Sequence, residues 1–366
     1  MASTMSQWGN DLYTGKRSYD IVGSRNRWLA VSLALILISV ALLVGRGLNP
    51  GIAFRGGSEF TVPGVSDTAQ QPAVDAVAGI PGAGVPRVSV VGSDPATLRV
   101  QTSELSDAQT NELADALAAA YGVDPEDVGS SYVGPQWGAD VTGKALRGLF
   151  TFLVLVSLVL TVYFRDWRMA IAGLVALVHD VGITVGVYAG IGWEVTPATV
   201  IGFLTILGYS LYDTVVVFDK VRENVDGALK QKRYTYGELA NLAVNQTLVR
   251  SINTSVVAVL PVGAILFIGA LLLGAGTLRD IALALFVGIL VGTYSSVFLA
   301  TPLLVWMRER EPAVAAHNAA VLAGRAARAA SGEPEPLHVG SLIPGAHLGN
   351  RAQPRRKPQR PPGRRP

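Results

Sequence analysis

An ionisable side chain, Asp213, lies well inside an apolar stretch at residues 198–220. That stretch is long enough to cross a bilayer, which takes about 20 residues. A carboxylate inside a membrane is costly unless it is neutralised, paired or hydrated, so such an aspartate is by default a functional candidate. The chemistry it offers is reversible protonation. The alternative is a static carboxylate that only holds helices together.

Arg250, at the start of a later apolar stretch, is the candidate cation for Asp213. Asp213 lies in the cytoplasmic half of its expected helix, and Arg250 enters from the cytoplasmic end, so similar depths allow a pair. Burial favours the neutral carboxyl and a nearby cation favours the ionised one. The sequence therefore predicts an acid that gains and loses a proton. An arginine that only reaches up to the lipid headgroups is the alternative.

Further polar side chains surround these two charges. Tyr209 and Ser210 lie about one helical turn before Asp213, so we expect both on its face, where they can hydrogen-bond either protonation state. Arg250 or its neighbour Ser251 shares a polar stripe with Thr254. The supporting candidates also include Thr214, Asn253 and Asp219, the last one expected at the cytoplasmic interface.

A second polar pair, His179 and Asp180, falls near the middle of another apolar segment. Adjacent residues of a helix point about 100° apart, so they are not expected to face one partner together. One of them is a candidate for the polar path while the other binds backbone or water. A purely structural role is an equal alternative.

The elements that must position these residues are membrane helices. The chain has 366 residues, of which 50% are hydrophobic and only 16% charged, with a mean hydropathy of +0.38. Such values are typical of an integral membrane protein. The apolar segments predict transmembrane helices at 28–46, 145–164, 169–191, 197–220, 248–274 and 280–306.

Basic residues in alternate loops predict the orientation, since Lys and Arg are enriched on the cytoplasmic side. By this rule the N-terminal segment 1–27, the loop 221–247 and the tail 307–366 lie in the cytoplasm, and residues 47–144 lie outside. The predicted location is a bacterial cytoplasmic membrane crossed several times, with both termini inside. The fold class is an α-helical polytopic membrane protein.

The outside segment 47–144 predicts a small α+β domain. We expect strands at 59–62, 87–91, 97–102 and 128–133, and helices at 69–79 and 107–121. The order β-α-β-β-α-β is that of a ferredoxin-like domain. The segment carries no catalytic motif, which favours a binding or hinge domain over an enzyme.

The composition also limits cofactors and partners. The chain has no cysteine and only four histidines, which are not grouped at ligand spacing, so neither a metal site nor another cofactor is expected. The tail 307–366 becomes rich in Ala, then in Pro and Arg, and predicts a disordered basic segment. Its attraction to anionic lipid or RNA would be unspecific, so no specific nucleic acid is expected.

Several motifs together resemble the SecF family of protein-export subunits. They are Phe54, Arg55, Gly56 and Gly57 after the first span, whose glycines suit a tight turn; VGP at 133–135; the pair HD at 179–180; GYSLYDTVVVFD at 208–219; and RSINT at 250–254. The run at 208–219 is the specific one. By this resemblance Asp213 and Arg250 match the charged residues of the family's proton path, and the energy source is the proton motive force.

The resemblance also implies an assembly. The partner would be SecD, the two subunits forming a twelve-helix bundle of the RND type beside the SecYEG channel, with accessory proteins similar to YajC and YidC. The substrate would be a translocating polypeptide, drawn out of the channel. Two other classes remain open from the residues: an RND-type exporter of small molecules or lipids, and a non-catalytic membrane scaffold.

Overall fold

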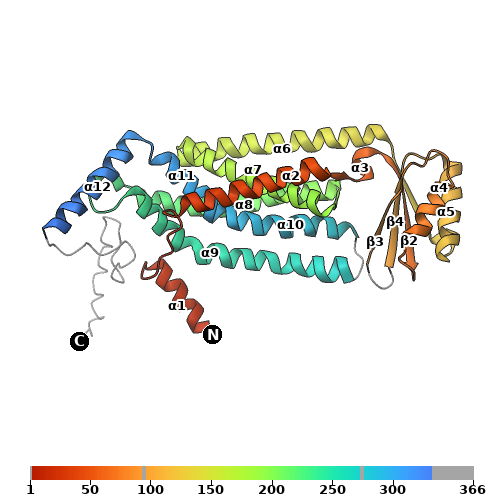
Figure 1. The fold of residues 1–366 in the computed structure, drawn as a ribbon, viewed down its shortest axis with the longest axis horizontal. Helices are drawn as coiled ribbons and strands as arrows, with labels where there is room; N and C mark the ends of the chain where they lie inside the picture. The colour runs from red at the N-terminus through yellow and green to blue at the C-terminus, as the bar shows by residue number, and fades with distance from the viewer. Residues whose placement is uncertain (1, 93–95, 273–275, 332–366) are drawn as a thin grey trace, which may run out of the picture.

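The computed structural model describes residues 2–92, 96–272 and 276–331. A long bundle of helices forms most of the molecule, and a small domain of strands and helices lies at one end of it (Figure 1). The N-terminus lies toward the opposite end of the bundle.

Within the described residues, six helices are long and apolar enough to cross a membrane. Their α-helical parts are α2 (Arg25–Arg46), α6 (Pro135–Phe164), α7 (Trp167–Ile191), α8 (Pro197–Val225), α9 (Tyr236–Ala264) and α10 (Gly276–Ser295). Two of them continue as wider π-helical turns: α9 into η3 (Ile265–Leu272), and α10 into η4 (Ser296–Ala300) and then α11 (Thr301–Arg308). In the described residues the six predicted spans are therefore confirmed as helices, and residues 273 and 274 of the span 248–274 lie outside the described part.

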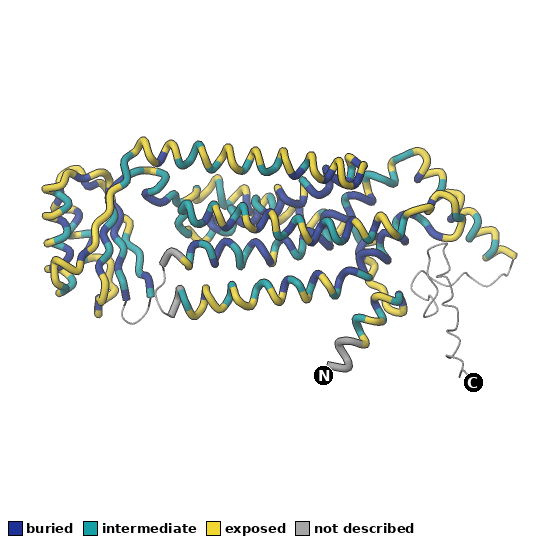
Figure 2. The backbone as a smooth tube through the Cα atoms, turned by 180° about the vertical axis from the view of Figure 1, so that it is seen from behind, coloured by how far each residue is buried: buried dark blue, intermediate teal, exposed yellow. Residues whose placement is uncertain are grey.

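Helix α7 lies at the centre of the bundle. In its most apolar 18-residue stretch 56% is buried, compared with 11% in α2 and 11% in α6. Buried stretches gather inside the bundle, whereas α6 is largely exposed along its length (Figure 2). Small residues allow the close packing. A Cβ atom added to Gly186 would lie 2.3 Å from the Cβ of Ser39 on α2, and one added to Gly288 would lie 2.1 Å from Ile206 Cδ1 on α8.

The small domain is a four-stranded antiparallel sheet with two helices on the face turned away from the bundle (Figure 1). Its elements run β2 (Gly57–Val65), α4 (Gln71–Ala78), β3 (Arg87–Val91), β4 (Ala96–Thr102), α5 (Asp107–Tyr121), the single 3-10 turn η1 (Pro125–Asp127) and β5 (Gly129–Val133). The strands lie in the order β3-β4-β2-β5. Fully buried Phe60, Leu98 and Leu113 join sheet and helices into one core.

A short junction connects this domain to the bundle. After α2 the chain forms β1 (Asn49–Pro50), which pairs in parallel with β6 (Glu194–Val195) in the turn between α7 and α8. The one-turn helix α3 (Ile52–Arg55) then leads into two glycines with positive φ, Gly56 at 80° and Gly57 at 132°. A Cβ on Gly57 would lie 2.4 Å from the carbonyl oxygen of Thr102, so the predicted tight turn requires glycine here.

Two expected boundaries are wrong. The segment 221–247 is not a loop throughout, because α8 continues to Val225 and α9 already begins at Tyr236. Only the residues between them, with the short turn η2 (Ala228–Lys230), connect the helices. Likewise α6 begins at Pro135, inside the segment assigned to the outside domain. Polar residues continue both helices beyond the apolar spans, which apolar patterning alone does not reveal.

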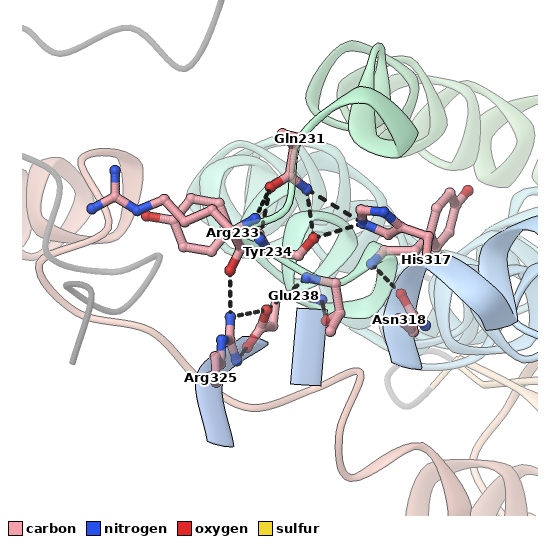
Figure 3. A network of polar contacts seen from close by, with 9 residues as sticks. Gln231, Arg233, Tyr234, Glu238, His317, Asn318 and Arg325 are labelled. Carbon is pink, nitrogen blue, oxygen red and sulfur yellow. Dashed lines mark hydrogen bonds and ion pairs between the residues drawn. The ribbon is translucent and has the colours of Figure 1, made fainter. Parts of the chain in front are cut away.

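The disorder expected from residue 307 is wrong for its first part, because α12 (Pro312–Ala330) is a helix that packs against the α8–α9 connection. Figure 3 shows the polar network between them. Arg325 binds Glu238 with Nη1 at 2.6 Å and Nη2 at 2.7 Å, and the backbone N–H of Tyr236 donates to Asn318 Oδ1 at 3.0 Å. Residues 332–366 of the expected tail lie outside the described residues.

The N-terminal segment also folds onto the bundle. Helix α1 (Ala2–Tyr13) packs against α9, with Leu12 fully buried. The chain after α1 is held by two amides of α9: Asn245 Oδ1 accepts from the Tyr19 N–H at 2.7 Å, and Asn241 Oδ1 accepts from the Val22 N–H at 3.0 Å.

Candidate functional site

Asp213 is buried in the bundle, with 5% of its surface exposed, and two serines from neighbouring helices bind its carboxyl group. Ser251 of α9 donates to Oδ1 at 2.7 Å, and Ser296, the first residue of η4, donates to Oδ2 at 2.5 Å. Hydroxyl donors favour the ionised form of a carboxyl, whereas burial favours the neutral one. Three helices thus meet at this buried carboxyl.

A second buried carboxyl, Asp180 of α7, has no exposed surface. Ser210 of α8 donates to its Oδ2 at 2.5 Å, and Ser295 of α10 donates to the same oxygen at 2.8 Å. The other oxygen, Oδ1, lies 3.2 Å from His179 Nδ1. The two adjacent residues of the HD pair therefore contact each other, and Ser210 faces Asp180 instead of Asp213, contrary to the expected shared face.

Arg250 does not contact Asp213. It is exposed on the outside of the bundle, and its Nη2 donates to the hydroxyl of Tyr212 at 3.0 Å. Within the described residues no lysine or arginine lies at ion-pair distance from Asp213. The next residue, Ser251, takes the place expected for the arginine, because consecutive residues of α9 point about 100° apart.

The other predicted residues fall into different surroundings. The hydroxyls of Tyr209 and Thr214 are buried near the site without a hydrogen bond of standard geometry. Asp219 is exposed and accepts from Tyr163 at 2.8 Å, away from the buried carboxyls. Asn253 is exposed, and Thr254 donates to the carbonyl of Arg250 in its own helix at 2.8 Å.

The segment Phe54–Gly57 lies at the junction with the small domain, not at the buried carboxyls. Phe54 is half-buried, and a Cβ on Gly138 of α6 would lie 2.5 Å from its carbonyl oxygen. The Arg55 side chain is exposed for the most part. Its guanidinium nevertheless has a lowered pKa, because partial desolvation disfavours the charged form. This motif therefore shapes the domain junction.

The residues that sequence reasoning missed are Ser295 and Ser296, and Gly292 lies one turn before them. A Cβ on Gly292 would lie 3.0 Å from Ser210 Cβ and 3.6 Å from Asp180 Oδ2, so glycine gives α10 its close approach. Two adjacent serines in an apolar span are a usable signal, but it does not name their partners.

In the described part of the chain no three His, Cys, Asp or Glu side chains gather as metal ligands. What the arrangement offers chemically is two buried carboxyls, groups that as a class can carry a proton or a negative charge.

Comparisons with known proteins agree on one family. Residues 113–310 match the family model "Protein export membrane protein SecD/SecF, C-terminal". The chain is 45% identical to protein translocase subunit SecF of Streptomyces coelicolor, covering 90% of this chain and 88% of that one. It is 43% identical to the subunit of the same name from Mycobacterium tuberculosis, over 92% and 77%.

A solved structure shares the fold. The crystal structure of SecDF, a translocon-associated membrane protein from Thermus thermophilus, is 33% identical with a TM-score of 0.71. The match covers 80% of this chain but only 39% of that one, so this chain spans about two fifths of the fused SecDF protein.

Proposed function

Because this chain belongs to the SecF family of protein translocase subunits, we propose that it works with SecD to help export proteins through the Sec channel. The SecD partnership is supported by relatives in which one chain carries both names, SecDF. The family resemblance extends the proposal to the SecYEG channel, to accessory proteins similar to YajC and YidC, and to a translocating polypeptide as substrate. The names of the relatives do not favour an exporter of small molecules.

The observation that carries the mechanism is the pair of serine bonds to Asp213. Buried and bound by Ser251 and Ser296, the carboxyl links α8 to α9 and η4. Protonation removes its charge and weakens these charge-assisted bonds. Moving one charge across the membrane potential supplies about 2.3 kcal/mol per 100 mV, enough to bias a helix rearrangement that differs by a few kcal/mol. The proton motive force is the proposed energy source, with no other cofactor.

In the proposed cycle Asp213 alternates between a neutral state and an ionised state paired with Arg250. In this structure the serines bind the carboxyl and Arg250 binds Tyr212, so forming the ion pair requires a rearrangement. A rotation of α9 by about one residue's angle, 100°, would exchange Ser251 for Arg250 at the carboxyl.

The small domain is proposed to lie outside the cytoplasmic membrane as a ferredoxin-like module, with both termini inside. Its strand order β3-β4-β2-β5 and its two helices support the assignment. Glu194, in the turn between α7 and α8, accepts from Gln101 of β4 at 2.7 Å, so movement of the bundle has a direct connection to the sheet.

The proton mechanism is tested by Asp213→Asn, which keeps the shape of the side chain and one of its two acceptor oxygens, places an NH2 donor at the other, and cannot titrate. We expect the variant to assemble with SecD and to lose the stimulation of export by a proton gradient, measured in inverted membrane vesicles. Asp219→Asn is the matched control, because this acid of the same helix is exposed. If Asp213→Asn responds to the gradient as the wild type does, Asp213 is structural and the mechanism is wrong.

A further inference from the structure

Two consecutive serines connect the two buried carboxyls. Ser295 Oγ lies 2.8 Å from Asp180 Oδ2, and Ser296 Oγ lies 2.5 Å from Asp213 Oδ2. A second connection runs through α8, because Ser210, three residues before Asp213, donates to Asp180 at 2.5 Å. Helix α8 therefore carries Asp213 and contacts Asp180, while the α10–η4 segment contacts both acids.

The two serines stand where the helix changes its geometry. Ser295 ends α10, and Ser296 begins the π-helical turn η4. Turns of this kind occur frequently at functional sites, because the wider winding re-aims side chains. Here consecutive side chains reach carboxyls on two different helices, α7 and α8.

Each serine has a second acceptor in its own helix. Ser295 Oγ lies 3.2 Å from the carbonyl oxygen of Gly292, and Ser296 Oγ lies 3.1 Å from that of Thr293. An ionised carboxyl accepts only, whereas a protonated one also donates. When a carboxyl gains a proton, the serine can return its hydroxyl to the helix carbonyl. The bonding at the start of η4 therefore depends on the protonation of both acids.

Among the described residues, the titratable side chains near the two acids are a histidine and two tyrosines. Asp180 has His179 beside it at 3.2 Å, and the other ring nitrogen of that histidine is buried without a hydrogen bond. The other two are phenols: Tyr294 stacks on His179, and Tyr209 lies near Asp213. Arg250, on α9, points away to Tyr212. The connections on which a coupling of the two acids can rest are therefore the serine bonds to their carboxyls.

We propose that Asp180 is a second protonation site, coupled to Asp213 through Ser295 and Ser296, so that η4 responds to the state of both acids. The inference rests on the proposed function of Asp213. The serines are positioning residues: no hydrogen bond joins their two hydroxyls, so the coupling is conformational and no proton passes between the acids through them.

The test is an infrared titration of the full chain with its partner subunits in membranes. It reads the carbonyl stretch of protonated carboxyls and needs no export. Asp180→Asn and Asp213→Asn should each remove one band from a buried carboxyl. In each variant the remaining band should titrate at a pH different from that in the wild type, because the serines and η4 no longer respond to a second acid that changes its protonation.

A double-mutant cycle tests the part played by the serines. Ser295→Ala removes a donor from Asp180 and none from Asp213. It should therefore reduce the effect of Asp213→Asn on the Asp180 band. Ser295→Thr keeps a hydroxyl and should retain that effect. Ser255→Ala is the matched control. Ser255 of α9 is also buried, but its hydroxyl bonds to the Ser251 carbonyl at 2.8 Å and to the Thr293 hydroxyl at 2.5 Å.

An Asp180 band that titrates at the same pH with and without Asp213→Asn would overturn the coupling. Equal results for Ser295→Ala and Ser255→Ala would overturn the role of the serines. Failure of the proposed function looks different: the coupled titration would persist while Asp213→Asn left gradient-driven export unchanged.

Discussion

At the scale of single residues, Arg250 and Ser251 show how one position decides a contact. Both lie near the depth of Asp213, yet only Ser251 reaches its carboxyl, at 2.7 Å. Arg250 binds the exposed Tyr212 on the outside of the same helix pair. An arginine at membrane depth without an acid beside it is costly in lipid, so we expect it to face protein or water in the assembled complex.

We expect Arg250→Met to reduce gradient-driven export about tenfold or more. The variant cannot form the proposed pair with Asp213, and a hydrogen bond to a charged group contributes about 1.5–3 kcal/mol. Arg250→Lys keeps the charge but loses the planar fork, so its loss should be smaller. Tyr212→Phe removes only the present partner of Arg250 and serves as the control. Export into inverted vesicles measures all three. Equal losses for the Met and Lys variants would mean that the charge is not what matters.

At the scale of elements, the docking of α12 shows how a sequence without strong hydropathy can still fold onto a bundle. The helix is rich in alanine and buries only two large apolar residues among the described ones, Val314 and Val321. Specific polar contacts supply the rest, with Arg325 holding Glu238 and Asn318 holding the Tyr236 N–H (Figure 3).

Val321→Asp should release α12, because Val321 is fully buried and an unpaired charge in an apolar contact is expensive. Cleavage by trypsin at Arg325 and Arg328 in sealed inverted vesicles should become at least about tenfold faster, the equivalent of about 1.4 kcal/mol. Leu322→Asp changes the adjacent residue, which is 56% exposed, and should leave the cleavage rate unchanged. The same rate for both variants would show that α12 is not held by this face.

At the scale of the whole molecule, the helical bundle separates two ends of different character. One end carries the sheet domain, joined through β1 and β6 and through the contact of Gln101 with Glu194. The other end carries α1, α12 and ion pairs such as Arg168 with Glu311 at 2.8 Å. Basic residues concentrate at this second end, as the positive-inside rule expects of the cytoplasmic side.

The orientation is tested with a reporter that is active only outside the cytoplasm. Fused after Gly122, which ends α5 in the sheet domain, it should be active. Fused after Gly227, in the connection between α8 and α9, it should be silent. Immunoblots control for the amount of each fusion. The reverse pattern would contradict the proposed topology.

The sequence by itself determined the elements that depend on local chemistry. Apolar length identified each span, and the residue pattern identified each strand of the small domain. Helix α5 has the predicted bounds, because Ser106 and Gln109 form a capping box at its start and Gly122 takes the left-handed conformation at its end. Positive-φ glycines fixed the turn at Gly56 and Gly57. Asp213 was a candidate from the sequence because a buried acid is costly wherever its helix lies.

Only the tertiary structure decided which side chains meet. Helical spacing placed Ser210 near the face of Asp213, but the packing of α7 against α8 gives it to Asp180. Depth allowed Arg250 to reach Asp213, but the rotation of α9 about its axis gives that place to Ser251. The partners Ser295 and Ser296 depend on a π-helical turn and on the approach that Gly292 permits. Rotation, winding and interhelical distance arise from packing between helices far apart in the sequence, and no local pattern encodes them.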